Sequence, residues 1–143
     1  MKNKIPKLFK GGISTDKRGS VSYNNNLTFK KKIKRFYLVK NFKQNFVRAW
    51  HGHKVEEKFI LCIKGKAKVS AVKINNFKNP SKRNKPYHFI LDSKIPNVVY
   101  VPAGYANGSK SISKDMKLLI FSTSTLNQSL KDDFRFSEKY WKI

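Results

Sequence analysis

Apolar and polar residues alternate along this chain in short runs, and almost nowhere with the period of a helix. Before Thr125 no segment keeps a 3.6-residue apolar repeat for three turns. Runs of roughly five to eight residues rich in Val, Ile, Phe and Tyr instead lie between Gly, Pro, Asn and Lys, which is typical of strands bounded by turns. The strands expected from these runs span residues 20–23, 33–40, 46–51, 58–64, 67–74, 88–92, 97–101, 107–112 and 117–122.

Turn residues divide these runs in a regular way. Gly65 separates two apolar runs and predicts a hairpin, and Pro102-Ala103-Gly104 predicts a tight turn. A long polar loop is expected over residues 75–86, and a helix cap at Ser124-Thr125 predicts a short helical turn near the C-terminus. So many short strands in 143 residues predict one all-β domain over residues 1–143, a sandwich or a closed barrel.

The charge of the chain is strongly positive, at +24 from 32 basic and 8 acidic residues. Nucleic acid is the usual partner of such a chain, but 27 of the basic residues are Lys, only 5 are Arg, and they are spread from Lys2 to Lys142. We therefore interpret the charge as a solvated surface that favours anionic small ligands, and expect neither a nucleic acid nor a membrane partner. The single Cys62 and the absence of a signal-like or membrane-spanning apolar run predict a soluble cytoplasmic protein.

The densest candidate chemistry lies in the segment Arg48-Ala49-Trp50-His51-Gly52-His53-Lys54. Two of the three histidines of the chain stand here at i and i+2, a spacing that places both imidazoles on one face of a strand. Arg48 adds a permanent cation suited to a phosphate or a carboxylate. A histidine near its free pKa is matched to removing a proton next to a ketone, and Lys58 or Arg48 then stabilises the enolate.

Two other interpretations of the histidine pair stay open. The spacing His51-x-His53-x-x-x-Glu57 is similar to the first metal-binding motif of cupins, but Asn107 stands where the further cupin histidine falls, which disfavours a metal. The remaining His88 has no motif around it. Alternatively, the two histidines are simply satisfied by hydrogen bonds on a strand and carry no chemistry.

Three motifs resemble those of one group of sugar-nucleotide enzymes. Arg48-Ala49-Trp50-His51 resembles the Arg-Gly-x-His segment of dTDP-4-dehydrorhamnose 3,5-epimerases, and residues 16–19 and 102–108 are similar to their Asp-x-Arg-Gly and Pro-x-Gly-Phe-Ala-His-Gly segments. The His51-x-His53-Lys54 pattern resembles that of the related, WxcM-like dTDP-sugar 3,4-ketoisomerases. The resemblance implies a small cupin (jelly-roll) barrel that needs no metal or other cofactor, forms a homodimer and acts on a nucleotide-diphosphate sugar.

The same resemblance implies roles for individual residues. His51 matches the catalytic base, Lys58 falls near the lysine proposed to stabilise the enolate, and Arg18 matches an arginine that contacts the nucleotide diphosphate, with Arg48 beside it. His53 is the candidate second catalytic group.

The chain also departs from the epimerases. No tyrosine follows the last strand at residues 121–126, where they place their general acid, so Tyr37 and Tyr105 are the candidate replacements. Tyr105 and Asn107 lie in the turn that the resemblance assigns to substrate binding.

The resulting hypothesis is proton abstraction next to the ketone of a dTDP-4-keto-6-deoxyhexose, as in 3,5-epimerases, in support of cell-surface polysaccharide synthesis. A 3,4-ketoisomerase is the alternative, which the two histidines favour, and a non-catalytic sugar-nucleotide binding module is a third. Asp132-Asp133 either orients His51 or forms an exposed turn. Trp50, on the face opposite His51, and the aromatic tail of Phe134, Tyr140 and Trp141 are expected to pack on the barrel or on a second subunit.

Overall fold

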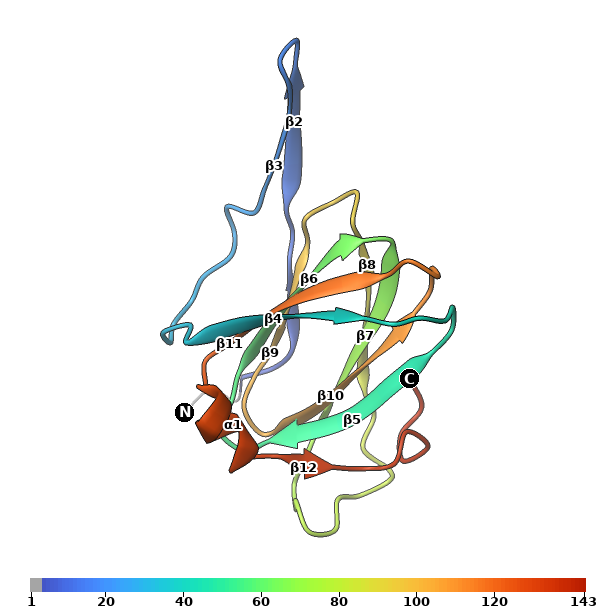
Figure 1. The fold of residues 1–143 in the computed structure, drawn as a ribbon. Coiled ribbons are helices and arrows are strands. Elements are labelled where there is room, and N and C mark those ends of the chain that lie inside the picture. The colour runs from blue at the N-terminus through green and yellow to red at the C-terminus, as the bar shows by residue number, and fades with distance from the viewer. Residues whose placement is uncertain (1–3) are drawn as a thin grey trace.

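Two five-stranded antiparallel sheets form most of the computed structural model, which describes residues 4–143 (Figure 1). In the first sheet the strand order is β1 (Lys7–Phe9), β9 (Val98–Val101), β6 (Lys58–Lys64), β11 (Lys117–Ser122) and β4 (Arg35–Lys40). In the second it is β12 (Phe134–Arg135), β5 (Val47–His53), β10 (Tyr105–Ser111), β7 (Lys66–Lys73) and β8 (Tyr87–Asp92). A separate hairpin of β2 (Gly12–Asp16) and β3 (Gly19–Tyr23) projects away from both sheets (Figure 1).

The core lies between the two sheets, because alternate residues of each strand point inward. Ile60 and Cys62 of β6 and Leu118 of β11 contribute from one side, and Val69 and Ala71 of β7 from the other. All five are at most 2 % exposed. The thiol of Cys62 is part of this core, as the apolar run around it predicted.

The prediction of an all-β protein is confirmed, and each of the nine expected strands forms. β6 and β11 begin and end where they were expected, while several of the others are displaced by one or two residues. β1, β2 and β12 were not predicted, because they are short or, in β2, polar and exposed. Within residues 4–143 no strand pairing joins the two sheets, so the domain is a two-sheet jelly-roll sandwich and the expected closure into a barrel is not seen.

The predicted helical turn is α1 (Leu126–Leu130). It starts with a capping box, in which the Thr125 hydroxyl accepts from the backbone N–H of Gln128 and the Gln128 side chain accepts from the backbone N–H of Thr125. In the described part of the chain no helix has the length and apolar character needed to cross a membrane.

The aromatic tail packs on the outer face of the second sheet. The rings of Trp50 and Trp141 lie 5.6 Å apart at 88°, and Phe136 lies 5.5 Å from Trp141. The Trp50 indole N–H donates to the carbonyl of Trp141, and the Trp141 indole donates to the carbonyl of Ser81. Packing within the chain, one of the two expectations for Trp50 and the tail, is therefore what the structure shows.

Candidate functional site

A small cavity between the sheets contains most of the predicted site residues. This cavity, the histidine pocket, has a volume of about 100 Å³. Strands β4, β5, β6, β10 and β11 line it with Tyr37, Val39, Arg48, His51, Lys58, Ile60, Asn107, Gly108, Ser109, Leu118 and Ile120. A base, two cations and a phenol thus share one cavity with a largely aliphatic wall.

An irregularity in strand pairing places Arg48 and His51 in the same pocket, although residues at i and i+3 of a regular strand face opposite sides. The pairing of β5 with β10 matches His51 to Asn107 but Arg48 to Ser109, so β5 has one extra residue in this stretch. The extra residue returns Arg48 to the inner face. The Asn107 amide donates to the carbonyl of His51 at 3.2 Å and ties the two strands at this point.

The environment of His51 keeps its imidazole neutral. Burial, followed by the positive charges of Lys58 and Arg135, lowers the pKa of His51 from 6.5 to about 4, and the negative charge of Asp133 opposes these effects. At neutral pH the ring therefore has an unshared electron pair that can accept a proton.

Lys58 and Tyr37 complete the polar part of the pocket. Lys58 is only 5 % exposed, and burial lowers the pKa of its ammonium while the negative charge of Glu56 opposes that effect. Burial, followed by repulsion from Glu56, raises the pKa of Tyr37 to about 12, so its hydroxyl stays protonated and can donate. These two groups can act on an oxygen of a ligand while His51 acts on a proton.

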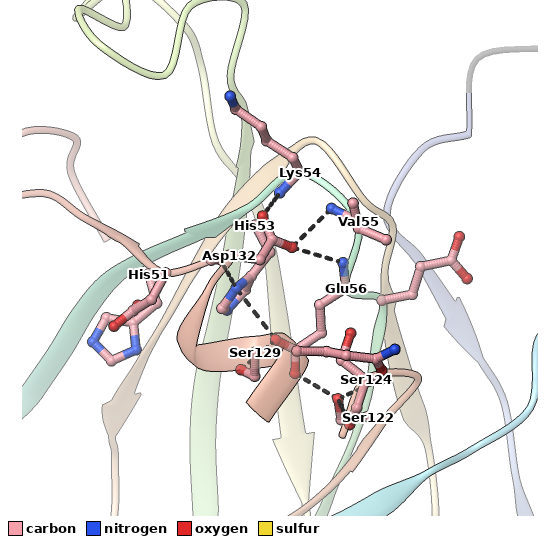
Figure 2. Close-up of polar contacts among 12 residues, drawn as sticks. His51, His53, Lys54, Val55, Glu56, Ser122, Ser124, Ser129 and Asp132 are labelled. Carbon is pink, nitrogen blue, oxygen red and sulfur yellow. Dashed lines mark hydrogen bonds and ion pairs between the residues drawn. The ribbon is translucent and has the colours of Figure 1, made fainter. Parts of the chain in front are cut away.

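His53 lies on the same side of β5 but is enclosed by other partners (Figure 2). Its Nδ1 lies 2.6 Å from the carbonyl oxygen of Asp132 and 3.2 Å from Oε2 of Glu56. The ring is 4 % exposed, and burial, followed by the charge of Lys58, lowers its pKa. Nε2 is buried and has no hydrogen-bond partner within residues 4–143.

Asp132 holds His53 and the loop that follows it. Its carboxylate accepts from the backbone N–H groups of Lys54, Val55 and Glu56 at 2.8 to 3.1 Å (Figure 2). The backbone carbonyl of Asp132 contacts His53, and within residues 4–143 no hydrogen bond joins Asp132 to the His51 ring, while Asp133 pairs with Arg135 at 3.0 Å. Glu56 was not predicted from the sequence as a site residue. The one signal for it is that Glu56 and Glu57, two of only eight acidic residues, stand side by side before a strand.

Two of the predicted binding residues lie outside the histidine pocket of their own chain. Arg18 is at the tip of the β2–β3 hairpin, where its side chain is 84 % exposed and pairs with Asp16 at 2.7 Å. Tyr105 is in the core between the sheets, 4 % exposed, and its hydroxyl donates to the carbonyl of Lys4 at 3.3 Å.

The three ligands of the suggested metal motif do not converge. The Glu57 carboxylate lies 2.9 Å from the ammonium of Lys4 and 3.4 Å from that of Lys31, and it lines a different cavity of about 260 Å³ with Phe59 and Tyr100. Among the residues that the structure describes, no group of three or more His, Cys, Asp or Glu is placed to hold a metal ion.

Comparison with known proteins gives one family and a set of similar folds. The family model described as FdtA: WxcM-like, C-terminal, matches residues 1–141. No curated protein sequence gives a significant match.

Among solved structures, a 3,4-ketoisomerase from Helicobacter canadensis has 20% identity and a TM-score of 0.71, covering 94% of this chain and 93% of its own. The WlaRB TDP-quinovose 3,4-ketoisomerase of Campylobacter jejuni has 23% identity and a TM-score of 0.68, with 98% of both chains covered. The rmlC epimerase of Mycobacterium tuberculosis has 15% identity and a TM-score of 0.76, covering 92% of this chain but 68% of its own. At these identities the likeness establishes the fold.

Proposed function

The chain belongs to the WxcM-like, C-terminal family, and from this membership we propose that it is an enzyme that isomerises a dTDP-linked 4-keto-6-deoxyhexose without a cofactor. The observation that carries the proposal is the convergence of His51, Lys58 and Tyr37 on one pocket. A neutral base, a buried cation and a protonated phenol are the groups that enolisation of a ketone needs.

The reaction begins when the neutral imidazole of His51 takes the proton from the carbon next to the ketone. The electron pair of that C–H bond forms the carbon–carbon double bond of an enolate, and the negative charge moves to the ketone oxygen. The ammonium of Lys58 stabilises this charge. Reprotonation of the enolate from an imidazolium or from the Tyr37 hydroxyl gives the product. Arg48, at the pocket wall, holds a phosphate of the nucleotide.

We favour 3,4-ketoisomerisation as the specific outcome. In this reaction the proton leaves C3 and a proton is returned at C4, while the hydroxyl proton of O3 passes to O4 and the ketone moves to C3. The ketoisomerases among the similar structures match this chain over nearly their full length, whereas the epimerase extends beyond it. The lack of a tyrosine in residues 121–126 points the same way. Lys58 falls near the lysine that is proposed to stabilise the enolate in the epimerases, so 3,5-epimerisation is the second candidate.

Incubation with dTDP-4-keto-6-deoxyglucose in deuterated water, followed by proton NMR of the sugar, tests the proposal. Relocation of the ketone to C3 with isotope exchange identifies a ketoisomerase, and deuterium at C3 and C5 identifies a 3,5-epimerase. The His51→Asn variant serves as the control, because it should bind dTDP as the unaltered protein does and exchange no deuterium. Binding of the sugar nucleotide without exchange by the unaltered protein would leave a binding module, and absence of binding would refute the proposal.

The position of Arg18 leads us to propose a homodimer. The β2–β3 hairpin has exposed apolar side chains, with Ile13 45 % and Val21 65 % exposed, and the outer face of β4 adds Phe36 and Leu38 at 67 % and 54 %. A second copy of the chain would cover such surfaces. In this arrangement Arg18 of the partner subunit reaches the diphosphate, which its position on a projecting hairpin does not permit within one chain (Figure 1).

Complementation between two inactive variants tests the dimer and the role of Arg18 together. A dimer formed from one Arg18→Ala chain and one His51→Asn chain contains one site with both original residues. Co-refolding the two variants should therefore restore activity that neither variant has alone. A mixture as inactive as its components, or a monomer by sedimentation, would refute the shared site.

The buried, unpaired Cys62 and the nucleotide-sugar substrate lead us to place this reaction in the cytoplasm, where it would supply polysaccharide synthesis.

A further inference from the structure

Glu56 is a fully buried carboxylate beside the histidine pocket. Its side chain has 0% exposure, yet it does not line the pocket. Oε1 accepts from the Ser122 hydroxyl at 2.5 Å, and Oε2 accepts from the Ser129 hydroxyl at 2.8 Å (Figure 2). Oε1 also accepts from Arg35 at 3.3 Å. Burial alone would raise the pKa of Glu56, but Lys58, the Ser122 hydroxyl and His53 together lower it, so the carboxylate is ionised.

This carboxylate is directed at the same nitrogen of His53 as a backbone carbonyl. The carbonyl of Asp132 can only accept, so Nδ1 of His53 carries the hydrogen, and Oε2 of Glu56 at 3.2 Å is a second acceptor for it. Nε2 is therefore the nitrogen that gains and loses a proton. It is also the nitrogen that has no partner among residues 4–143.

Charges of both signs surround His53. Lys58 from β6 and the neighbouring His51 disfavour a positive imidazole, while Glu56 and Asp132 favour it. Glu56 is the ionised group within 3.2 Å of the ring and thus the main counter-charge to Lys58.

We infer that Glu56 is a positioning residue that keeps His53 protonated on Nδ1 and stabilises the imidazolium formed when Nε2 takes a proton. The catalytic part of this inference rests on the proposed function, whereas the effect of Glu56 on the charge of His53 does not. When a proton reaches Nε2, the Nδ1–H bond stays intact and the positive charge of the ring faces Oε2 of Glu56. Loss of that proton from Nε2 restores the neutral ring.

Titration of the histidine ring nitrogens by ¹⁵N NMR, without any substrate, tests the charge effect directly. Glu56→Gln should lower the pKa of His53 relative to the unaltered protein, because it removes the negative charge that lies 3.2 Å from Nδ1. The matched control is Glu57→Gln, which removes the same charge from the adjacent buried carboxylate that faces Lys4 and Lys31 on the other side of β6. Glu57→Gln should leave the pKa of His53 unchanged. Equal shifts in the two variants, or no shift in Glu56→Gln, would overturn the inference.

Ser129→Ala gives an independent test if Glu56→Gln does not fold. It removes a competing donor from Oε2 of Glu56, so more of the negative charge faces His53 and the pKa of His53 should rise. A fall or no change would contradict the inference. Because these titrations need no turnover, a failure of the inference can be distinguished from a failure of the proposed reaction. With turnover, Glu56→Gln should lower kcat and leave KM within about twofold, whereas a general loss of structure would change both.

Discussion

Replacing Lys58 with Met tests the electrostatics of the histidine pocket most directly. Methionine is unbranched, keeps most of the buried volume of the side chain and removes the ammonium charge. Lys58 is 5 % exposed and shares the pocket with His51, so its ammonium is placed to stabilise an enolate in a site from which water is largely excluded. Removal of one preorganised group of this kind costs a factor of about 10² to 10³ in kcat.

The same substitution should move the pH dependence. Activity requires the neutral form of His51, so in the unaltered protein kcat/KM should be retained as pH falls from 7 and lost only near the pKa of about 4. Burial is the largest cause of this low pKa and Lys58 is the next. In Lys58→Met the burial remains, so we expect the acid limb to move to a pH between about 4 and 6.5.

The assay is kcat/KM from pH 4 to 8 for the unaltered protein, Lys58→Met and the control Lys54→Met. Lys54 lies four positions earlier, outside the histidine pocket, and its ammonium is over the rings of Phe77 and Phe134. Lys54→Met should therefore keep both the rate and the acid limb. The reasoning is wrong if Lys58→Met retains full kcat, or if it loses activity while its acid limb stays near pH 4.

Three further predictions concern the phenol, the tail and the folded state. Tyr37→Phe should lower kcat by a factor of about 10² or more with dTDP affinity unchanged, since its hydroxyl is a proton donor in the pocket; unchanged kcat would exclude that role. Trp141→Ala should reduce the free energy of unfolding by ~3–5 kcal/mol in urea titrations, because it empties the contact with Trp50, and Trp141→Phe should cost less; equal losses would contradict the packing argument. His51 binds protons less readily folded than unfolded, so stability should be complete above pH 6.5 and decrease between 6.5 and about 4, and His51→Asn should flatten that decrease.

Much of the site was visible in the sequence because its members lie on strands with regular alternation. His51 and His53 were placed on one face by their i, i+2 spacing, and Trp50 on the other. The structure places Tyr37, His51 and Lys58 in one cavity, and their catalytic roles stay predictions. Arg48 was expected beside His51 from its motif, but regular pairing would have placed it on the opposite face, and only the irregularity against β10 returns it.

Other contacts depend on residues distant along the chain. Glu56 meets Ser122 and Ser129 across more than 60 positions, and Asp132 meets His53 across 79. Such contacts form where the end of one sheet meets the segment around α1, and no local pattern specifies them. Tyr105 is a case in which the local motif indicated substrate binding, but the packing of the two sheets made the residue part of the core.

The sequence by itself determined the class of fold, most strand positions, the helix cap at Thr125 and the chemical types gathered in the pocket. These follow from local physics: side-chain alternation, turn residues and capping act over a few neighbouring positions. The tertiary structure alone decided that no strand pairing joins the two sheets within residues 4–143, that His53 is held by Glu56 and Asp132, and that Arg18 lies on a projecting hairpin. Those outcomes depend on how two sheets pack and on which distant groups must satisfy one another once water is removed.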